Sequence, residues 1–374
     1  MLRKYLHIAA GSVLLASPLA LLATSPVAFA AATTTTWSAT NTQATTLADA
    51  TNLGTLPADT PLQIVVGLSL NHPDALRQYI QSISTPGTST FGDSLTPSEF
   101  TATYGPTDAQ VQSVTDYLSQ AGLSDISVSS NNLLITADGS ASQIDTAFNT
   151  QLDQFSQAGQ TVYANVTPAE VPSSLQGVVA GVLGLNNAAR MSLPLAFKSV
   201  STSSLPNYPA SYNPQGFWQA YDVGNTPAAS GTNIAIFAEG DLTQVVDDLR
   251  TEETANDLPQ VPLTVVPVGI ASPDTSGADE WDLDTQYSTG MAGTVAHLYV
   301  YDTTSLTDSD IAREFNAFAS QDVAKAGSAS FGECEFDAYL DGSMVIDDEI
   351  FAEAAAQGQT TFASAGDTGG FCAV

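Results

Sequence analysis

The sequence is poor in basic residues, with 8 Lys and Arg against 39 Asp and Glu in 374 residues, a formal net charge of −31. Without a basic patch a surface cannot follow a phosphate backbone, which excludes nucleic acid as a partner and disfavours anionic membrane surfaces. The acidic excess keeps a protein soluble at low pH, but it is equally compatible with an ordinary secreted protein rich in Ser, Thr and Asp.

Cysteine and histidine are also scarce. The two cysteines, Cys334 and Cys372, are too few to form a zinc site alone. In an exported chain they predict one disulfide, which would stabilise the fold by about 3–4 kcal/mol, and the alternative is two buried free thiols. His297 is the only histidine after residue 72, and it lies in the alternating segment 296–300. That position indicates a strand residue rather than the base of a histidine-dependent protease.

Long apolar stretches are absent except near the start of the chain. The basic residues Arg3 and Lys4 precede an apolar stretch over 8–22, and Ala28-Phe29-Ala30 has the small-x-small pattern of a cleavage site. We therefore expect a signal peptide over 1–30, cleavage after Ala30 and secretion. No later segment is long and apolar enough to cross a bilayer, so no membrane association is expected after cleavage.

The N-terminal half predicts a module of its own. Residues 31–59 are rich in Thr and Ala and are expected to form a flexible arm. The module, residues 60–189, is expected to be an antiparallel α+β domain, with strands at 62–70, 126–128 and 133–136 and helices at 74–83, 107–121 and 141–148. The Ser- and Pro-rich segment 190–207 has the composition of an exposed linker and is the predicted processing site.

Residues 208–374 alternate between short apolar runs and helical patterns. The expected strands are 233–238, 263–268, 295–301, 327–331 and 360–364, and the expected helices are 242–254, 280–296, 309–326 and 344–357. This order is typical of a doubly wound parallel sheet, whose functional residues gather beyond the carboxyl ends of the strands. Glu239, the segment 330–332 and Asp367 all follow expected strands closely.

Two carboxylates on one expected helix are the clearest chemical signal. Glu280 and Asp284 are four residues apart, so they share a helix face, where like charges repel. One carboxyl can keep its proton while the other acts as a base in acid. A solvated acidic face is the plain alternative. A calcium loop built on Asp279, Asp282 and Asp284 is disfavoured, because the EF-hand spacing is absent.

Several motifs in a consistent order resemble the sedolisins, which are secreted, acid-active serine-carboxyl peptidases with a subtilisin-like fold and a large N-terminal propeptide. The motifs are Leu95-Thr-Pro-Ser-Glu-Phe100, Tyr104-Gly-Pro106, Tyr163-Ala-Asn165 and Val182-Leu-Gly-Leu185 in the first module, and Glu280-x-x-Leu-Asp284, Ser330-Phe-Gly332 and Gly366-Asp-Thr-Gly369 in the second. The resemblance implies a pro-kumamolisin-type activation domain and a partial subtilisin-like α/β sheet.

The resemblance also implies roles for three acidic residues. Glu280 would be the general base that activates a serine, and Asp284 would orient Glu280. A carboxylic base is ionised near pH 4, where imidazole is protonated and cannot act as a base. Asp367 would stabilise the oxyanion, because a protonated carboxyl can donate a hydrogen bond to it, an interaction worth about 3–4 kcal/mol.

Four more residues receive supporting roles from the resemblance. Glu239 and Phe331 would flank the carboxylate pair, although Phe331 stands where the family usually has tryptophan and so lacks an indole N–H donor. Ser330 and Gly332 would begin the substrate-binding segment.

The same resemblance sets expectations for the rest of the protein. The nucleophile of the family lies in a Ser-Gly-Thr-Ser-type turn that does not occur in residues 1–374, so we expect an N-terminal portion that is inactive on its own. The calcium expected for the family would bind beyond residue 374, with no cofactor within this chain. Expected partners are protein or peptide substrates and the propeptide as an intramolecular inhibitor. The competing hypothesis is a non-catalytic secreted inhibitor or binding module that carries a degenerate peptidase half.

Overall fold

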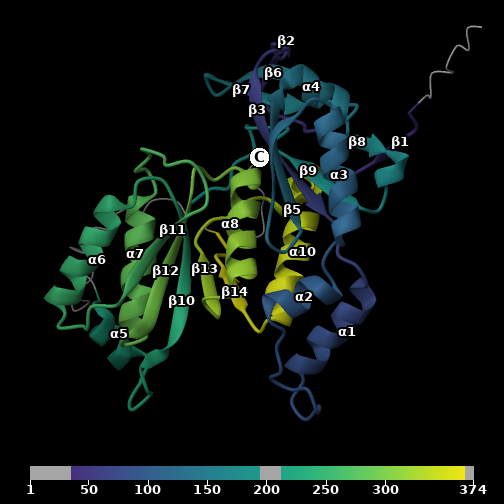
Figure 1. Ribbon diagram of the computed structural model, residues 1–374. Coiled ribbons are helices and arrows are strands. Elements are labelled where there is room, and N and C mark those ends of the chain that lie inside the picture. Colours follow the sequence, from purple (N-terminus) through teal and green to yellow (C-terminus); the bar gives the residue numbers. More distant parts are fainter. Residues whose placement is uncertain (1–34, 194–211, 367–374) are drawn as a thin grey trace, which may run out of the picture. The chain divides into compact units, whose positions relative to one another are not determined.

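The computed structural model describes residues 35–193 and 212–366, and those from Thr36 onward belong to one compact unit (Figure 1). Antiparallel sheets occupy the N-terminal half of this unit and a parallel sheet the C-terminal half. None of the described helices has the length and apolarity needed to cross a membrane.

The N-terminal half combines antiparallel sheets with helices. A four-stranded sheet has the order β4-β5-β3-β9, a three-stranded sheet the order β2-β6-β7, and β1 pairs with β8. The strands are β1 (Trp37–Ala39), β2 (Thr51–Thr55), β3 (Pro61–Leu68), β4 (Ser124–Val128), β5 (Leu134–Ser140), β6 (Leu152–Gln157), β7 (Gln160–Asn165), β8 (Glu170–Pro172) and β9 (Val179–Leu183). The helices are α1 (Pro73–Ser84), α2 (Pro97–Thr103), α3 (Asp108–Gln120) and α4 (Ala141–Ala147), with a short 3₁₀ turn η1 (Ser173–Leu175).

Local sequence explains where three of these helices begin. Thr96, Thr107 and Ser140 each cap a helix, and a Glu or Gln three residues later closes a capping box. Each box satisfies backbone N–H groups that have no partner within the helix.

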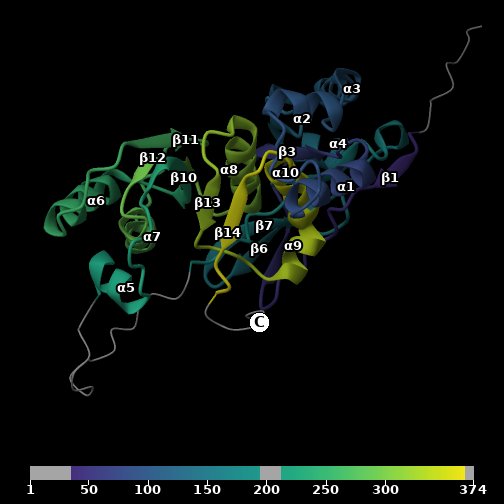
Figure 2. The same ribbon diagram turned by 90° about the horizontal axis from the view of Figure 1, so that it is seen from below.

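The C-terminal half is built on one sheet of five parallel strands in the order β11-β12-β10-β13-β14 (Figure 2). Helices α6 and α7 pack on each other, as do α8 and α10. The strands are β10 (Ala229–Glu239), β11 (Leu263–Pro267), β12 (Val295–Thr303), β13 (Ala326–Ala329) and β14 (Thr360–Ala363). The helices are α5 (Pro214–Ala220), α6 (Thr243–Ala255), α7 (Ala278–Met291), α8 (Asp308–Gln321), α9 (Glu335–Asp341) and α10 (Ser343–Ala356). The expected α/β class, with a parallel sheet preceded by an antiparallel α+β half, is confirmed.

Helix α10 joins the two halves. Its Ile346 side chain lies against Gly67 of β3 and Gly181 of β9, where a side chain at either glycine would meet it. Residues from both halves, among them Val65, Leu183 and Ile350, belong to one buried apolar cluster. The glycines thus let a helix of the C-terminal half lie directly on the N-terminal sheet.

The prediction of a flexible arm over 31–59 is wrong for residues 35–59, which are the part of this segment that the structure describes. β1 pairs with β8, and β2 pairs with β6, so residues 37–39 and 51–55 are strands. The sequence did not indicate these strands, because they have few apolar residues and are held by backbone pairing with distant strands. The β6–β7 hairpin and helices α5 and α9 were also not expected. The expected helices 280–296 and 309–326 are shorter, since α7 ends at Met291 and α8 at Gln321.

Candidate functional site

Helix α7 places the expected carboxylate pair beside the segment that follows β13. Glu280 lies in the first turn of α7 and Asp284 one turn later. The hydroxyl of Ser330 donates a hydrogen bond to Oδ1 of Asp284 over 2.8 Å. Residues 46 positions apart therefore meet because the strands of a parallel sheet end at one edge.

The environment of Asp284 favours its protonated form. Burial raises the pKa of Asp284 to about 7, the hydrogen bond from Ser330 lowers it, and the nearby charge of Glu280 raises it. In acid Asp284 therefore keeps its proton and can act as a hydrogen-bond donor.

Glu239 is the last residue of β10 and is linked to helix α7 through its backbone. The indole N–H of Trp281 donates to the backbone oxygen of Glu239 over 3.0 Å. The pKa of Glu239 is raised to about 7, chiefly by burial and then by the charge of Asp274, while Arg190 acts to lower it. Trp281, the residue that follows Glu280, therefore links α7 to β10 through the backbone of Glu239.

Phe331 is buried in an aromatic cluster with Trp281 and Phe315. It is 2% exposed, its ring packs edge-on against Trp281 with centroids 6.2 Å apart, and it stacks on Phe315 at 6.1 Å. The indole N–H that the family usually offers at this position is replaced here by aromatic packing alone.

Gly332 pairs with the first residues of the linker. The backbone N–H of Ser192 donates to the oxygen of Gly332 over 2.9 Å, and the N–H of Gly332 donates back over 3.2 Å, forming an antiparallel bridge. An extended peptide could make the same two bonds, since they use only backbone groups.

Two carboxylates near the site were missed from the sequence, the half-buried Asp302 and the buried Glu314. Asp302 lies at the end of β12, in register with Ala238 of β10, and burial raises its pKa to about 6. Glu314 of α8 is 0% exposed and accepts a hydrogen bond from the N–H of Ala238 over 3.0 Å. Asp302 directly follows an expected strand, as Glu239 does, and that signal could have found it. No sequence pattern around Glu314 indicates that it lies near the site.

A depression lies at the same ends of β10 and β12. It has a volume of about 570 Å³ and is lined by residues that include Gly240, Leu242, Pro273 and Asp302. Its lining mixes apolar walls with a carboxylate, as binding pockets do.

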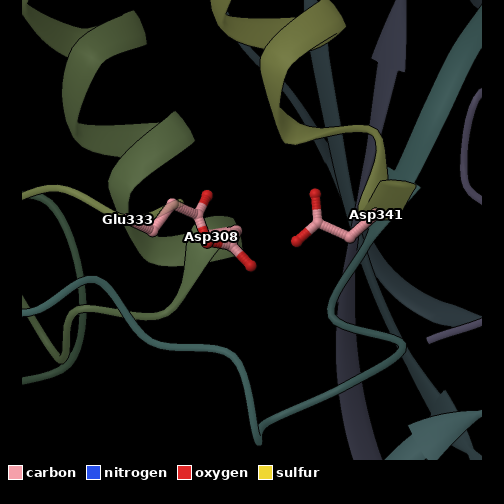
Figure 3. Close-up of side chains that lie close together, drawn as sticks. All are labelled: Asp308, Glu333 and Asp341. Carbon is pink, nitrogen blue, oxygen red and sulfur yellow. The ribbon is translucent and has the colours of Figure 1, made fainter. Parts of the chain in front are cut away.

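A second group of acidic residues includes Glu333, which directly follows the 330–332 segment. Carboxylate oxygens of Asp308, Glu333 and Asp341 are all within 4.8 Å of one another (Figure 3). Acidic groups are common without an ion, and nothing else at this cluster indicates a metal.

The remaining residues considered from the sequence are Asp367, the two cysteines and His297. Asp367 and Cys372 lie outside the described residues, so the oxyanion role and the disulfide with Cys334 stay predictions. Cys334 is the N-cap residue of α9. His297 lies in β12, within 2.8 Å of the hydroxyl of Thr264 and stacked on Tyr299, as a strand residue would be.

Comparisons with known proteins agree with the motifs. The family "Pro-kumamolisin, activation domain" matches residues 48–188. Xanthomonalisin from Xanthomonas sp. (strain T-22) is 37% identical over 335 residues, 84% of this chain and 40% of that protein. Sedolisin from Pseudomonas sp. (strain 101) is 37% identical over 323 residues, 84% of this chain and 55% of that protein.

Among solved structures, Pseudomonas sedolisin (serine-carboxyl proteinase) complexed with two molecules of pseudo-iodotyrostatin is 36% identical, with a TM-score of 0.39 over 41% of this chain and 44% of that chain.

Residues 48–188 thus match the pro-kumamolisin activation domain, and 84% of the chain is similar to xanthomonalisin and sedolisin, which confirms the resemblance seen in the motifs. It spans about half the length of the curated relatives that it matches.

Proposed function

We propose that this chain is part of the proprotein of a secreted, acid-active serine-type endopeptidase. The observation that carries the proposal is the position of the Glu280–Asp284 pair, which is linked through the Ser330 hydroxyl to the segment expected to bind substrate. The relation to serine-carboxyl peptidases supports the reaction class.

In this proposal each acidic residue has a separate task. Glu280 accepts the proton of the attacking serine, and the protonated Asp284 holds Glu280 in place by donating a hydrogen bond. The raised pKa of Asp284, about 7, supports this division of labour, because at pH 3–5 the group still carries its proton. Asp367 would donate to the oxyanion.

The activation domain would act as an intramolecular inhibitor. The bridge between Ser192 and Gly332 supports this, since the linker uses backbone groups that an extended substrate would need. Cleavage within 190–207 would then free the segment. Signal cleavage after Ala30, secretion, the Cys334–Cys372 disulfide and a calcium site beyond residue 374 belong to the same proposal, and no residue of this chain is assigned to calcium.

The test uses the reading frame that encodes this chain together with any in-frame codons after Val374. Peptide hydrolysis is measured from pH 3 to 7 for the parent and for Glu280→Gln, Asp284→Asn and the control Glu335→Gln. Loss of a general base costs about 10²–10⁴-fold in rate, so we expect at least a hundredfold loss for Glu280→Gln and parent activity for the control. An active Glu280→Gln variant would refute the assigned role.

A further inference from the structure

Three chain segments meet at the carboxyl cluster formed by Asp308, Glu333 and Asp341. Asp308 is the first residue of α8, Asp341 is the last residue of α9, and Glu333 directly follows Gly332. Asp308 and Asp341 are each 6% exposed, and Figure 3 shows the three carboxyl groups converging. Three ionised groups at this spacing and burial would repel strongly.

Ordinary donors satisfy only part of the cluster. The backbone N–H of Ser343 donates to Oδ1 of Asp341 over 2.9 Å, and its hydroxyl lies 3.4 Å from Oε1 of Glu333. Oδ1 of Asp308 and Oδ2 of Asp341 are buried, and no N–H or hydroxyl group of the described residues reaches them. The nearest polar neighbours are the other carboxyl groups, since oxygens of Asp308, Glu333 and Asp341 lie within 4.8 Å of one another. Two ionised carboxyls cannot donate to each other, so a hydrogen bond within the cluster requires a proton on one of them, and the most buried candidates are Asp308 and Asp341.

The surrounding charges strengthen this need for a proton. Asp337 of α9 and Asp347 of α10 face the cluster, and Asp348 acts on Asp347. The four ion pairs among the described residues, Arg77–Asp74, Arg250–Glu253, Arg313–Asp310 and Lys325–Asp322, all lie elsewhere. Burial first and the neighbouring carboxylates second raise the pKa of Asp308 and of Asp347.

We propose that the carboxyl cluster is a proton-dependent clamp, which fastens the segment after β13 to the ends of α8 and α9 in acid and releases it as the solution becomes neutral. The clamp acts on the residue next to Gly332, so it controls the order of the segment that the linker bridges through Ser192. This inference goes beyond the proposed function and does not depend on peptidase activity.

The direction of the pH effect follows from linkage. A carboxyl whose pKa is higher in the folded state holds its proton more tightly there. Below the unfolded pKa near 4 both states carry the proton, and between the two pKa values only the folded state does. The stabilising contribution is complete below the unfolded pKa and is lost as pH rises through the folded pKa. This is opposite to the usual effect of a salt-bridged carboxylate.

Amide hydrogen exchange of the full chain at pH 4.5, 6 and 7.5, corrected for intrinsic rates, tests the clamp. We expect protection over residues 331–343 to fall at least about tenfold from pH 4.5 to 7.5, the effect of one unit of pKa shift in one group. Helix α3 serves as the internal reference and should keep its protection.

The variant Asp308→Asn supplies amide donors at every pH, so the fall over 331–343 should shrink to less than about threefold. Glu333→Gln should also reduce it and covers the case in which Asp308→Asn does not fold. Glu335→Gln, at an exposed position in the first turn of α9, is the matched control and should behave like the parent.

Three results would overturn the clamp. Protection over 331–343 could be independent of pH in the parent, or it could fall equally in Asp308→Asn and in the parent. Finally, millimolar calcium could restore protection at pH 7.5 in the parent but not in Asp308→Asn, which would make the cluster a metal site instead.

Discussion

Asn131 is a buried polar contact between the N-terminal half and the helices of the C-terminal half. Its amide nitrogen donates to Oδ1 of Asn316 over 2.7 Å and to Oε2 of Glu353 over 2.6 Å. All three side chains are buried, with exposures of 1%, 4% and 0%. Replacing Asn131 with leucine would leave both acceptors without this donor.

The structure sets the size of the expected effect. Each buried acceptor that loses its donor costs about 1–3 kcal/mol, and the bond that Asn131 accepts from the N–H of Leu133 is lost as well. Allowing for the apolar area that leucine buries, we expect Asn131→Leu to lower the free energy of unfolding by at least about 2 kcal/mol.

The loss should depend on pH through Glu353. Burial raises its pKa to about 7, and the hydrogen bond from Asn131 lowers it. At pH 5 the folded protein keeps this proton in the parent and in the variant. At pH 8 the carboxylate is ionised in the parent, and in the variant it has lost a donor, so the destabilisation should be larger at pH 8.

Urea denaturation followed by circular dichroism at pH 5 and pH 8 measures both effects. Gln63→Leu is the matched control, because Gln63 makes an exposed amide–carboxylate bond to Asp138 over 2.8 Å. Its loss should be within about 0.5 kcal/mol of zero. The reasoning fails if Asn131→Leu loses no more than Gln63→Leu, or if its loss is the same at both pH values.

Two further predictions concern the candidate site. Phe331→Ala should lower the free energy of unfolding by about 3–5 kcal/mol in urea denaturation, whereas Phe336→Ala, with 64% exposure, should change it by less than about 0.5 kcal/mol. Equal losses would contradict the packing role of Phe331. Ser330→Ala should raise the pKa of Asp284 in a carboxyl NMR titration, since the lost hydrogen bond lowers it. An unchanged or lower pKa would show that this bond does not act on Asp284.

Much of the parallel sheet could be predicted because buried parallel strands are continuous apolar runs. The expected strand 233–238 lies within β10 at 229–239, and the expected strand 295–301 lies within β12 at 295–303. The strands of the N-terminal arm could not be predicted in this way. β1 is held by β8, more than 120 residues away, and β2 is exposed throughout, so neither carries an apolar pattern.

The sequence by itself determined the relation to the sedolisins, the α/β class and the carboxylate pair, because the i,i+4 spacing of Glu280 and Asp284 is local to one helix. Only the tertiary structure decided that Ser330 meets Asp284, that Ser192 bridges Gly332, and that Asp308 converges with Glu333 and Asp341. These partners lie far apart in the chain, and their meeting depends on which strands are neighbours in the sheet. Strand order arises from packing of the whole core, which no short sequence pattern records.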